Sequence, residues 1–205
     1  MSLIPLGFWA ASAGGGIGYF LKILFGAGNT EQNRSIITDL DGNVFSAGST
    51  ASTDSGRRDS VVTKSAPDGS VTFANSFTGT GTSSFQSLKL GSSGDIFVGG
   101  TDTSSAVSRG PGVMKLNASG VIQWQRRLIS GYSDGYEVAL DSSDNVFFVG
   151  RDYDASTAYV AMLVKYNSAG TLQFKTGLNS GGNDRFSGLA LDSSANAYAS
   201  GTGED

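Results

Sequence analysis

The chain has 205 residues, including 30 glycines and 3 prolines, and it contains neither cysteine nor histidine. The absence of these two residue types excludes disulfides, thiol catalysis, a Ser-His-Asp triad and zinc or haem sites that need thiolate or histidine ligands. With 39% hydrophobic residues, 16% charged residues and a net charge of −4, the chain is apolar enough for a packed core. Its charge does not favour nucleic acid or anionic lipid as a partner.

The first 18 residues form an apolar segment that ends in glycines. Its large apolar positions are Leu3, Ile4, Pro5, Leu6, Phe8 and Trp9. A signal peptide is one interpretation, because Ala11-Ser12-Ala13 is similar to a cleavage site, but no basic residue precedes the apolar run and Pro5 interrupts it. A membrane span is disfavoured by Pro5, Lys22 and the many glycines. The third interpretation is a hydrophobic anchor that fills a groove on another protein, with residues 14–18 as a hinge.

The sequence of this segment resembles a known class of peptide. SLIPLGFWAAS, followed by glycines, is similar to the N-terminal peptide of tailed-phage virion proteins, including tail-fibre and baseplate-associated ones. The resemblance implies that the N-terminus docks on the particle while the rest of the chain faces outward. It also implies other tail or baseplate proteins as partners, several copies per particle and a location in the virion.

A repeat of about 50 residues follows. Glycine ends an aromatic strand at Gly48, Gly100, Gly150 and Gly201, with spacings of 52, 50 and 51 residues. Two further markers recur in phase: a lysine in a β-like stretch (Lys64, Lys115 and Lys165) and a large aromatic residue (Phe73, Trp124 and Phe174). Three markers that share one period indicate a structural repeat rather than chance.

Each repeat predicts four short strands. The first precedes an Asp/Asn/Gly turn, the second carries Phe or Tyr, the third the lysine and the fourth the large aromatic residue. The predicted units are 35–77, 86–128 and 136–178, a partial unit covers 188–205, and residues 19–24 are predicted to form the outer strand of a further unit. A period of 50 residues with four strands indicates an all-β fold, a β-propeller of four-stranded antiparallel blades. Three and a half blades make an incomplete ring, so we expect a continuation past Asp205 or completion by other copies.

Both halves of the repeat resemble a known family. GNVFSAGST, GDIFVGGTD, DNVFFVGRD and ANAYASGTG resemble the core motif of the bacterial and viral β-propeller repeat family. VMKLNASGVIQWQRRL and VKYNSAGTLQFKTGL resemble the other half of its repeat. The resemblance covers residues 19–205 and implies a propeller fold. The first unit departs from it, because Pro67, Asp68 and Gly69 replace the usual turn and Phe73 replaces tryptophan.

The carboxylates and other polar residues give weaker signals. The turn that starts at Asp39 begins like a calcium loop, but its twelfth position is Thr50 rather than glutamate, so a structural turn is favoured. Asp152 and Asp154 could pair with Asp134 or Glu137 as glycosidase carboxylates, although a solvated loop is the favoured interpretation. The repeated Phe45, Phe97, Phe147 and Tyr198 predict packing between blades.

These patterns predict no catalytic residue, no cofactor and no metal. Three segments rich in Ser, Thr, Gly and Asp are predicted as loops that suit hydrogen bonding to sugars: Ser49–Arg58, Thr101–Pro111 and Asp152–Ala158. The first functional hypothesis is a phage virion structural protein, anchored by its N-terminal peptide, that adheres to a host-surface glycan or decorates the particle. The alternatives are a secreted or cell-surface bacterial propeller that binds glycan or protein, and a propeller hydrolase or lyase.

Overall fold

The described part of the chain is built from antiparallel strands. The structure, a computed structural model, describes residues 32–51, 58–77, 82–105, 108–128, 133–154 and 158–204. These residues form 14 strands and no helix, so none that could cross a membrane lies among them. The predicted all-β class and four-stranded antiparallel units are confirmed, whereas no closed ring is detected among the described strands. The predicted strand 19–24 lies outside the described residues.

The strands form four sheets, in each of which the strands pair in chain order. Sheet I contains β1 (Gln32–Thr38), β2 (Val44–Ala51), β3 (Arg58–Ser65) and β4 (Val71–Phe77). Sheet II contains β5 (Ser84–Leu90), β6 (Ile96–Ser105), β7 (Ser108–Leu116) and β8 (Ile122–Arg127). Sheet III contains β9 (Asp134–Leu140), β10 (Val146–Asp154), β11 (Ala158–Tyr166) and β12 (Leu172–Leu178). Sheet IV, as described, contains β13 (Arg185–Leu191) and β14 (Ala197–Thr202).

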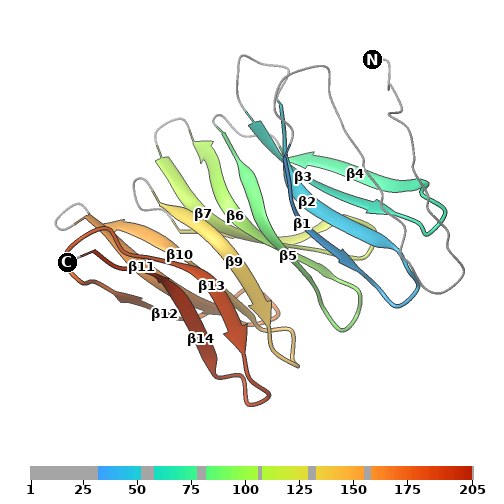
Figure 1. The fold of residues 1–205 in the computed structure, drawn as a ribbon. Helices are drawn as coiled ribbons and strands as arrows, with labels where there is room; N and C mark the ends of the chain where they lie inside the picture. The colour runs from blue at the N-terminus through green and yellow to red at the C-terminus, as the bar shows by residue number, and fades with distance from the viewer. Residues whose placement is uncertain are drawn as a thin grey trace, which may run out of the picture.

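The sheets follow one another along the molecule in sequence order (Figure 1). The first strands of successive sheets are neighbours, with β1 beside β5, β5 beside β9 and β9 beside β13. Two apolar clusters fill the spaces between the four-stranded sheets. Phe45 and Val62 of sheet I pack with Leu88, Val98 and Leu116 of sheet II. Burial of each large side chain contributes about 2 kcal/mol, so these clusters hold the stack together.

The repeated aromatic residue of the second strand behaves differently in sheet IV. Phe45, Phe97 and Phe147 are 2%, 0% and 2% exposed, as expected for packing between sheets. Tyr198 occupies the same place but is 62% exposed. The prediction is therefore wrong for Tyr198, because sheet IV has no third strand among the described residues to support a cover for the ring.

The repeated glycine of the second strand lies beside a β-bulge in the first strand. In each sheet the register between the first two strands skips one residue of the first strand beside this glycine. A Cβ added at Gly48, Gly100, Gly150 or Gly201 would lie 1.8 to 2.2 Å from a carbonyl oxygen of the first strand. Such a distance leaves no room for a side chain, so the bulge requires glycine. The period of the glycine therefore records a close approach of two backbones.

The hairpins between second and third strands are longer than expected. β6 extends to Ser105 and β7 starts at Ser108, with Thr101 paired to Pro111 and Asp102 to Gly110. β10 likewise extends to Asp154 and β11 starts at Ala158. The loop prediction is wrong for the described residues of Thr101–Pro111, because backbone pairing does not require the alternating apolar side chains by which strands are recognised in sequence.

Candidate functional site

The lysine of each repeat lies over the aromatic ring of the neighbouring strand. Strand pairing places three lysines directly opposite three phenylalanines: Lys64 opposite Phe45, Lys115 opposite Phe97 and Lys165 opposite Phe147. The Nζ atoms lie 5.0, 5.2 and 4.5 Å from the ring centroids. This geometry is that of a cation–π contact, so the repeated lysine stabilises the sheet rather than presenting a free ammonium group.

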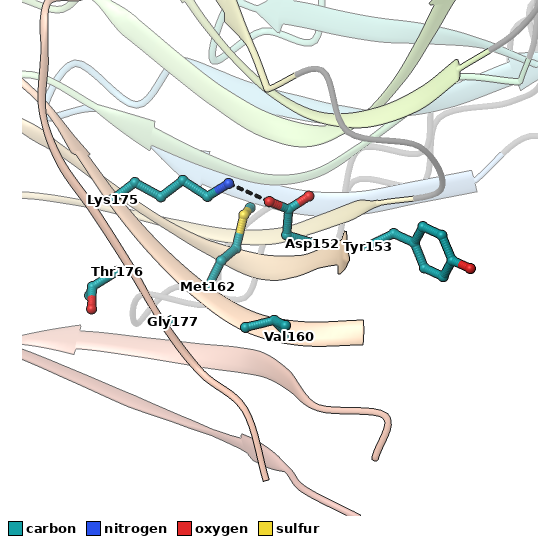
Figure 2. A pocket seen from close by; sticks show the side chains of 7 residues that line it. All are labelled: Asp152, Tyr153, Val160, Met162, Lys175, Thr176 and Gly177. Carbon is teal, nitrogen blue, oxygen red and sulfur yellow. Dashed lines mark hydrogen bonds and ion pairs between the residues drawn. The ribbon is translucent and has the colours of Figure 1, made fainter. Parts of the chain in front are cut away.

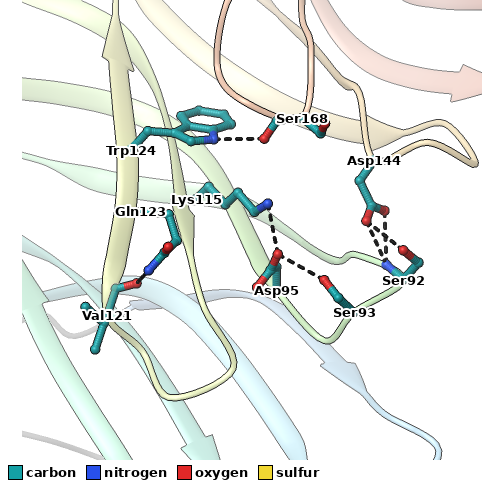
Figure 3. A network of polar contacts seen from close by, with 9 residues as sticks. All are labelled: Ser92, Ser93, Asp95, Lys115, Val121, Gln123, Trp124, Asp144 and Ser168. Carbon is teal, nitrogen blue, oxygen red and sulfur yellow. Dashed lines mark hydrogen bonds and ion pairs between the residues drawn. The ribbon is translucent and has the colours of Figure 1, made fainter.

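The ammonium groups of Lys115 and Lys165 also reach the turn between the first and second strands. Lys115 Nζ lies 2.8 Å from Asp95 Oδ2, and Ser93 donates a hydrogen bond to the same carboxylate (Figure 3). In sheet III, Lys165 Nζ lies 3.6 Å from Asp141 Oδ2. In sheets II and III a carboxylate of the turn, at different turn positions, and the aromatic ring together surround one ammonium group.

The turn aspartate also organises its own backbone. The N–H groups of Ser143 and Asn145 and the side-chain amide of Asn145 all donate to Asp141, at 2.8 to 3.0 Å. Burial raises the pKa of Asp141, but these hydrogen bonds and the charge of Lys165 outweigh it, so the pKa of the carboxyl lies below its ordinary value. The turns at Asp39 and Asp192 repeat the pattern. The carboxylate oxygens of these aspartates accept hydrogen bonds from their own turns, which favours a structural turn over a calcium loop.

Sheet II departs from this pattern, and its neighbour compensates. Gly91 stands where the other turns carry aspartate. The backbone N–H and the hydroxyl of Ser92 instead donate to the carboxylate of Asp144 in sheet III, at 3.0 and 2.8 Å (Figure 3). A Cβ at Gly91 would lie 3.1 Å from the carboxylate of Asp144 and 2.9 Å from the ring of Phe97, so the glycine makes room for this link between sheets.

The aromatic residue of the fourth strand packs on the next sheet. Trp124 donates from Nε1 to the carbonyl of Ser168 at 3.1 Å (Figure 3). A Cβ added at Gly170 would lie 2.7 Å from the indole of Trp124, and one at Gly120 would lie 3.1 Å from the ring of Phe73. The aromatic residue and the turn glycine are thus two halves of one contact between neighbouring sheets. Sequence periodicity alone does not reveal this, because the halves belong to different repeats.

The carboxylates considered as a glycosidase pair are engaged in other contacts. Asp134 accepts two hydrogen bonds from Arg151, at 2.9 and 2.6 Å, and a third from Thr101. Glu137 accepts the backbone N–H of Leu189 at 2.9 Å. The side chain of Asp154 lies outside what the structure describes. The contacts of Asp134 and Glu137 join neighbouring strands or sheets, so both carboxylates take part in holding the stack together.

A groove lies beside the tip of the β10–β11 hairpin. It has a volume of about 420 Å³ and is lined by Asp152, Tyr153, Val160, Met162, Lys175, Thr176 and Gly177 (Figure 2). Lys175 forms an ion pair with Asp152, which also accepts a hydrogen bond from Ser133 at 2.8 Å. The groove combines an aromatic edge with a paired carboxylate and ammonium group. No sequence pattern marks Lys175, because its partner Asp152 lies 23 residues away and neither residue belongs to a motif.

The predicted anchor lies outside the described residues. Leu3, Ile4, Pro5, Leu6, Phe8 and Trp9 all precede Gln32, where the described part begins. The anchor therefore stays a prediction from the sequence. Comparison with known proteins adds no identity, because no protein-family model matches the chain and no curated protein matches it.

Proposed function

We propose that the chain is a structural protein of a tailed-phage virion. Residues 1–18 hold it to a tail, baseplate or fibre partner, and the stacked sheets belong to a β-propeller that faces outward. The propeller serves host-surface adhesion or decorates the particle. The anchor rests on the resemblance of the first 18 residues, and the propeller rests on the resemblance of the repeat and on the way the described sheets are built.

The observation that carries the proposal is the structural use of the polar residues that define the repeat. The recurrent lysines, turn aspartates and aromatic residues bind one another or the next sheet. A repeat whose marker residues serve its own packing is a scaffold, and recognition then falls to the segments that differ from unit to unit. These segments are residues 1–18 and the hairpin tips.

The stacking of the sheets supports the propeller part of the proposal. Successive four-stranded antiparallel sheets pack face to face, and their first strands lie side by side along one edge of the stack (Figure 1). Radial repetition of such sheets is the propeller architecture, with the first strands gathered near the axis.

The anchor is tested by deleting residues 2–13 in the phage gene and measuring incorporation into purified virions. We expect the deleted protein to be absent from particles while the isolated protein keeps its circular dichroism spectrum and melting temperature. A matched pair isolates the apolar contact: Trp9→Ser should prevent incorporation, and Ser12→Ala should not. Normal incorporation of the deletion variant contradicts the proposal. A mature protein that starts at residue 14 would instead favour the secreted or cell-surface alternative.

A further inference from the structure

The groove beside the tip of the β10–β11 hairpin lies on the face of sheet III that is turned toward sheet II. Its lining includes Val160 and Met162 of β11, and Met162 belongs to the apolar cluster between these two sheets. Asp152 pairs with Val160 across the strands, so its side chain leaves the sheet on the same face. The groove therefore belongs to a complete four-stranded sheet, on the side away from sheet IV.

A glycine keeps this groove open. Gly177 of β12 lines it, and a Cβ added there would lie 2.9 Å from a methyl group of Val160. In sheet II the equivalent of Gly177 is Arg127, whose Nε would lie 3.3 Å from a Cβ added at Gly110, the equivalent of Val160. Sheet III thus has an open space of about 420 Å³ where sheet II has a long side chain. Small-molecule sites have volumes of about 300–1,000 Å³, so the space suits a small ligand.

The larger polar and aromatic side chains of the groove are not part of the repeat. Strand pairing gives the equivalents of Lys175, which are Gln125 in sheet II and Ala74 in sheet I. Counting three residues from the repeated glycine gives the equivalents of Tyr153, which are Thr103 and Ala51. The residues that recur in every sheet serve packing, so a ligand is expected at residues that one sheet alone carries.

A buried serine holds the two hairpin residues of the groove. The hydroxyl of Ser133 donates to Asp152 Oδ1 at 2.8 Å and accepts the backbone N–H of Tyr153 at 2.9 Å. The ring of Tyr153 packs edge to face on Tyr159, with centroids 5.4 Å apart, and Arg151 lies 4.0 Å over the ring of Tyr159. Side chains held in this way lose little freedom when a ligand binds, which favours binding.

Lys175 and Asp152 form an electrically neutral pair that still offers hydrogen-bond donors. Figure 2 shows Lys175 reaching along the groove toward Asp152. The Lys175 side chain is 39% exposed, and an ammonium group has three N–H donors, of which the ion pair needs one. The carboxylate repels an anionic ligand and cancels the charge that would attract one. The chemistry that fits is a neutral molecule with several hydroxyl groups.

We propose that this groove binds a neutral pyranose sugar at the end of an oligosaccharide. The sugar hydroxyls accept hydrogen bonds from Lys175. The C–H groups of the sugar ring pack on Val160 and on Tyr153, because the face of an aromatic ring is negative and attracts the weakly positive C–H groups. The inference names the ligand class for the adhesion role proposed above, and it rests on that proposal for the source of the sugar, a host-surface glycan.

The probes are the methyl glycosides of glucose, galactose, mannose and N-acetylglucosamine, with N-acetylneuraminic acid as the anionic comparison. Each is titrated against the full chain, and binding is followed by ligand-detected NMR. We expect saturable binding of at least one neutral glycoside and none of the acid. Tyr153→Ala and Lys175→Met should each weaken this binding about tenfold. Tyr153→Phe and Lys175→Arg should keep most of it, because the ring and the donors remain.

Two control variants match these changes outside the groove. Gln125→Met replaces a polar side chain by methionine at the position in sheet II that is equivalent to Lys175. Tyr198→Ala removes an exposed tyrosine from sheet IV. Both should leave sugar binding unchanged, and circular dichroism establishes that every variant is folded.

Three results would overturn the inference. The first is that none of the four neutral glycosides binds, and the second is that Tyr153→Ala and Lys175→Met leave binding unaltered. The third is tighter binding of N-acetylneuraminic acid than of any neutral glycoside, because the site would then select an anion. These titrations need only the isolated chain, so their failure leaves the anchor proposal intact. Normal incorporation of the variant that lacks residues 2–13 would instead refute the virion role and leave the groove as a sugar site.

Discussion

Replacing Gly150 by alanine tests the physical reason for the period of the repeat. The added Cβ would lie 2.1 Å from the carbonyl oxygen of Asp134 and 3.0 Å from the Cα of Gly135. Ordinary contacts start near 3.4 Å, so the first and second strands of sheet III would have to separate by roughly 1.3 Å at this point. Both obstacles are backbone atoms, and no side-chain rotation relieves the clash.

The expected cost follows from this geometry. Forcing extra volume into a packed site costs about 1–3 kcal/mol, and separating the strands weakens one or two ladder hydrogen bonds of about 1 kcal/mol each. We therefore expect Gly150→Ala to lower the free energy of unfolding by about 3 kcal/mol. For a chain of this length, this loss corresponds to a decrease in melting temperature of about 10 °C.

The assay is thermal unfolding followed by circular dichroism, with Gly94→Ala as the matched control. Gly94 has a φ of +78°, and only Ala118 lies near an added Cβ, at 3.8 Å. Ala195 occupies the same turn position in sheet IV with a φ of 61°, so alanine fits there at a cost of about 1 kcal/mol. Equal losses of stability in the two variants would refute the explanation based on the carbonyl contact.

Three further predictions concern polar contacts. Because the folded-state pKa of Asp141 is lowered, its contribution to stability is complete above about pH 4 and is lost as the pH falls further. Asp141→Asn should therefore reduce the decrease in the urea midpoint that acid causes. An unchanged dependence of the midpoint on pH would contradict this. Arg151→Met should lower the free energy of unfolding, measured by urea denaturation, by about 3 kcal/mol, because it leaves the buried carboxylate of Asp134 without its cation. The double variant Arg151→Met with Asp134→Leu should recover much of this loss. Asp144→Ala should cost about 1 kcal/mol and speed amide hydrogen exchange in the 91–95 turn of sheet II, whereas unchanged exchange would show that the link between sheets is not needed.

The sequence predicts the strands well because each unit repeats its markers. The turn glycines Gly69, Gly120 and Gly170 all adopt positive φ, as their place in the predicted hairpins requires. The need for glycine at position 150 cannot be predicted from local sequence in this way, because the group that excludes a side chain is the carbonyl of Asp134 on another strand. The hairpin extensions of sheet II were missed because Thr101 to Ser105 carry small polar side chains without alternation.

The candidate site was harder to predict than the fold. Its contacts join residues of different strands or units, such as Arg151 with Asp134 and Trp124 with Ser168. Periodicity identifies equivalent residues but does not state which of them meet. The anchor shows the opposite case, because its residues stand out in the sequence and lie outside the described part of the chain.

The contact between an aromatic residue and a glycine of the next sheet has an evolutionary consequence. Phe73 with Gly120 and Trp124 with Gly170 join the same two repeat positions in successive units. A tandem duplication of one period, inserted in phase, would bring both partners of this contact with it at each new boundary. Gene recombination can therefore change the length of the array without inventing a new interface.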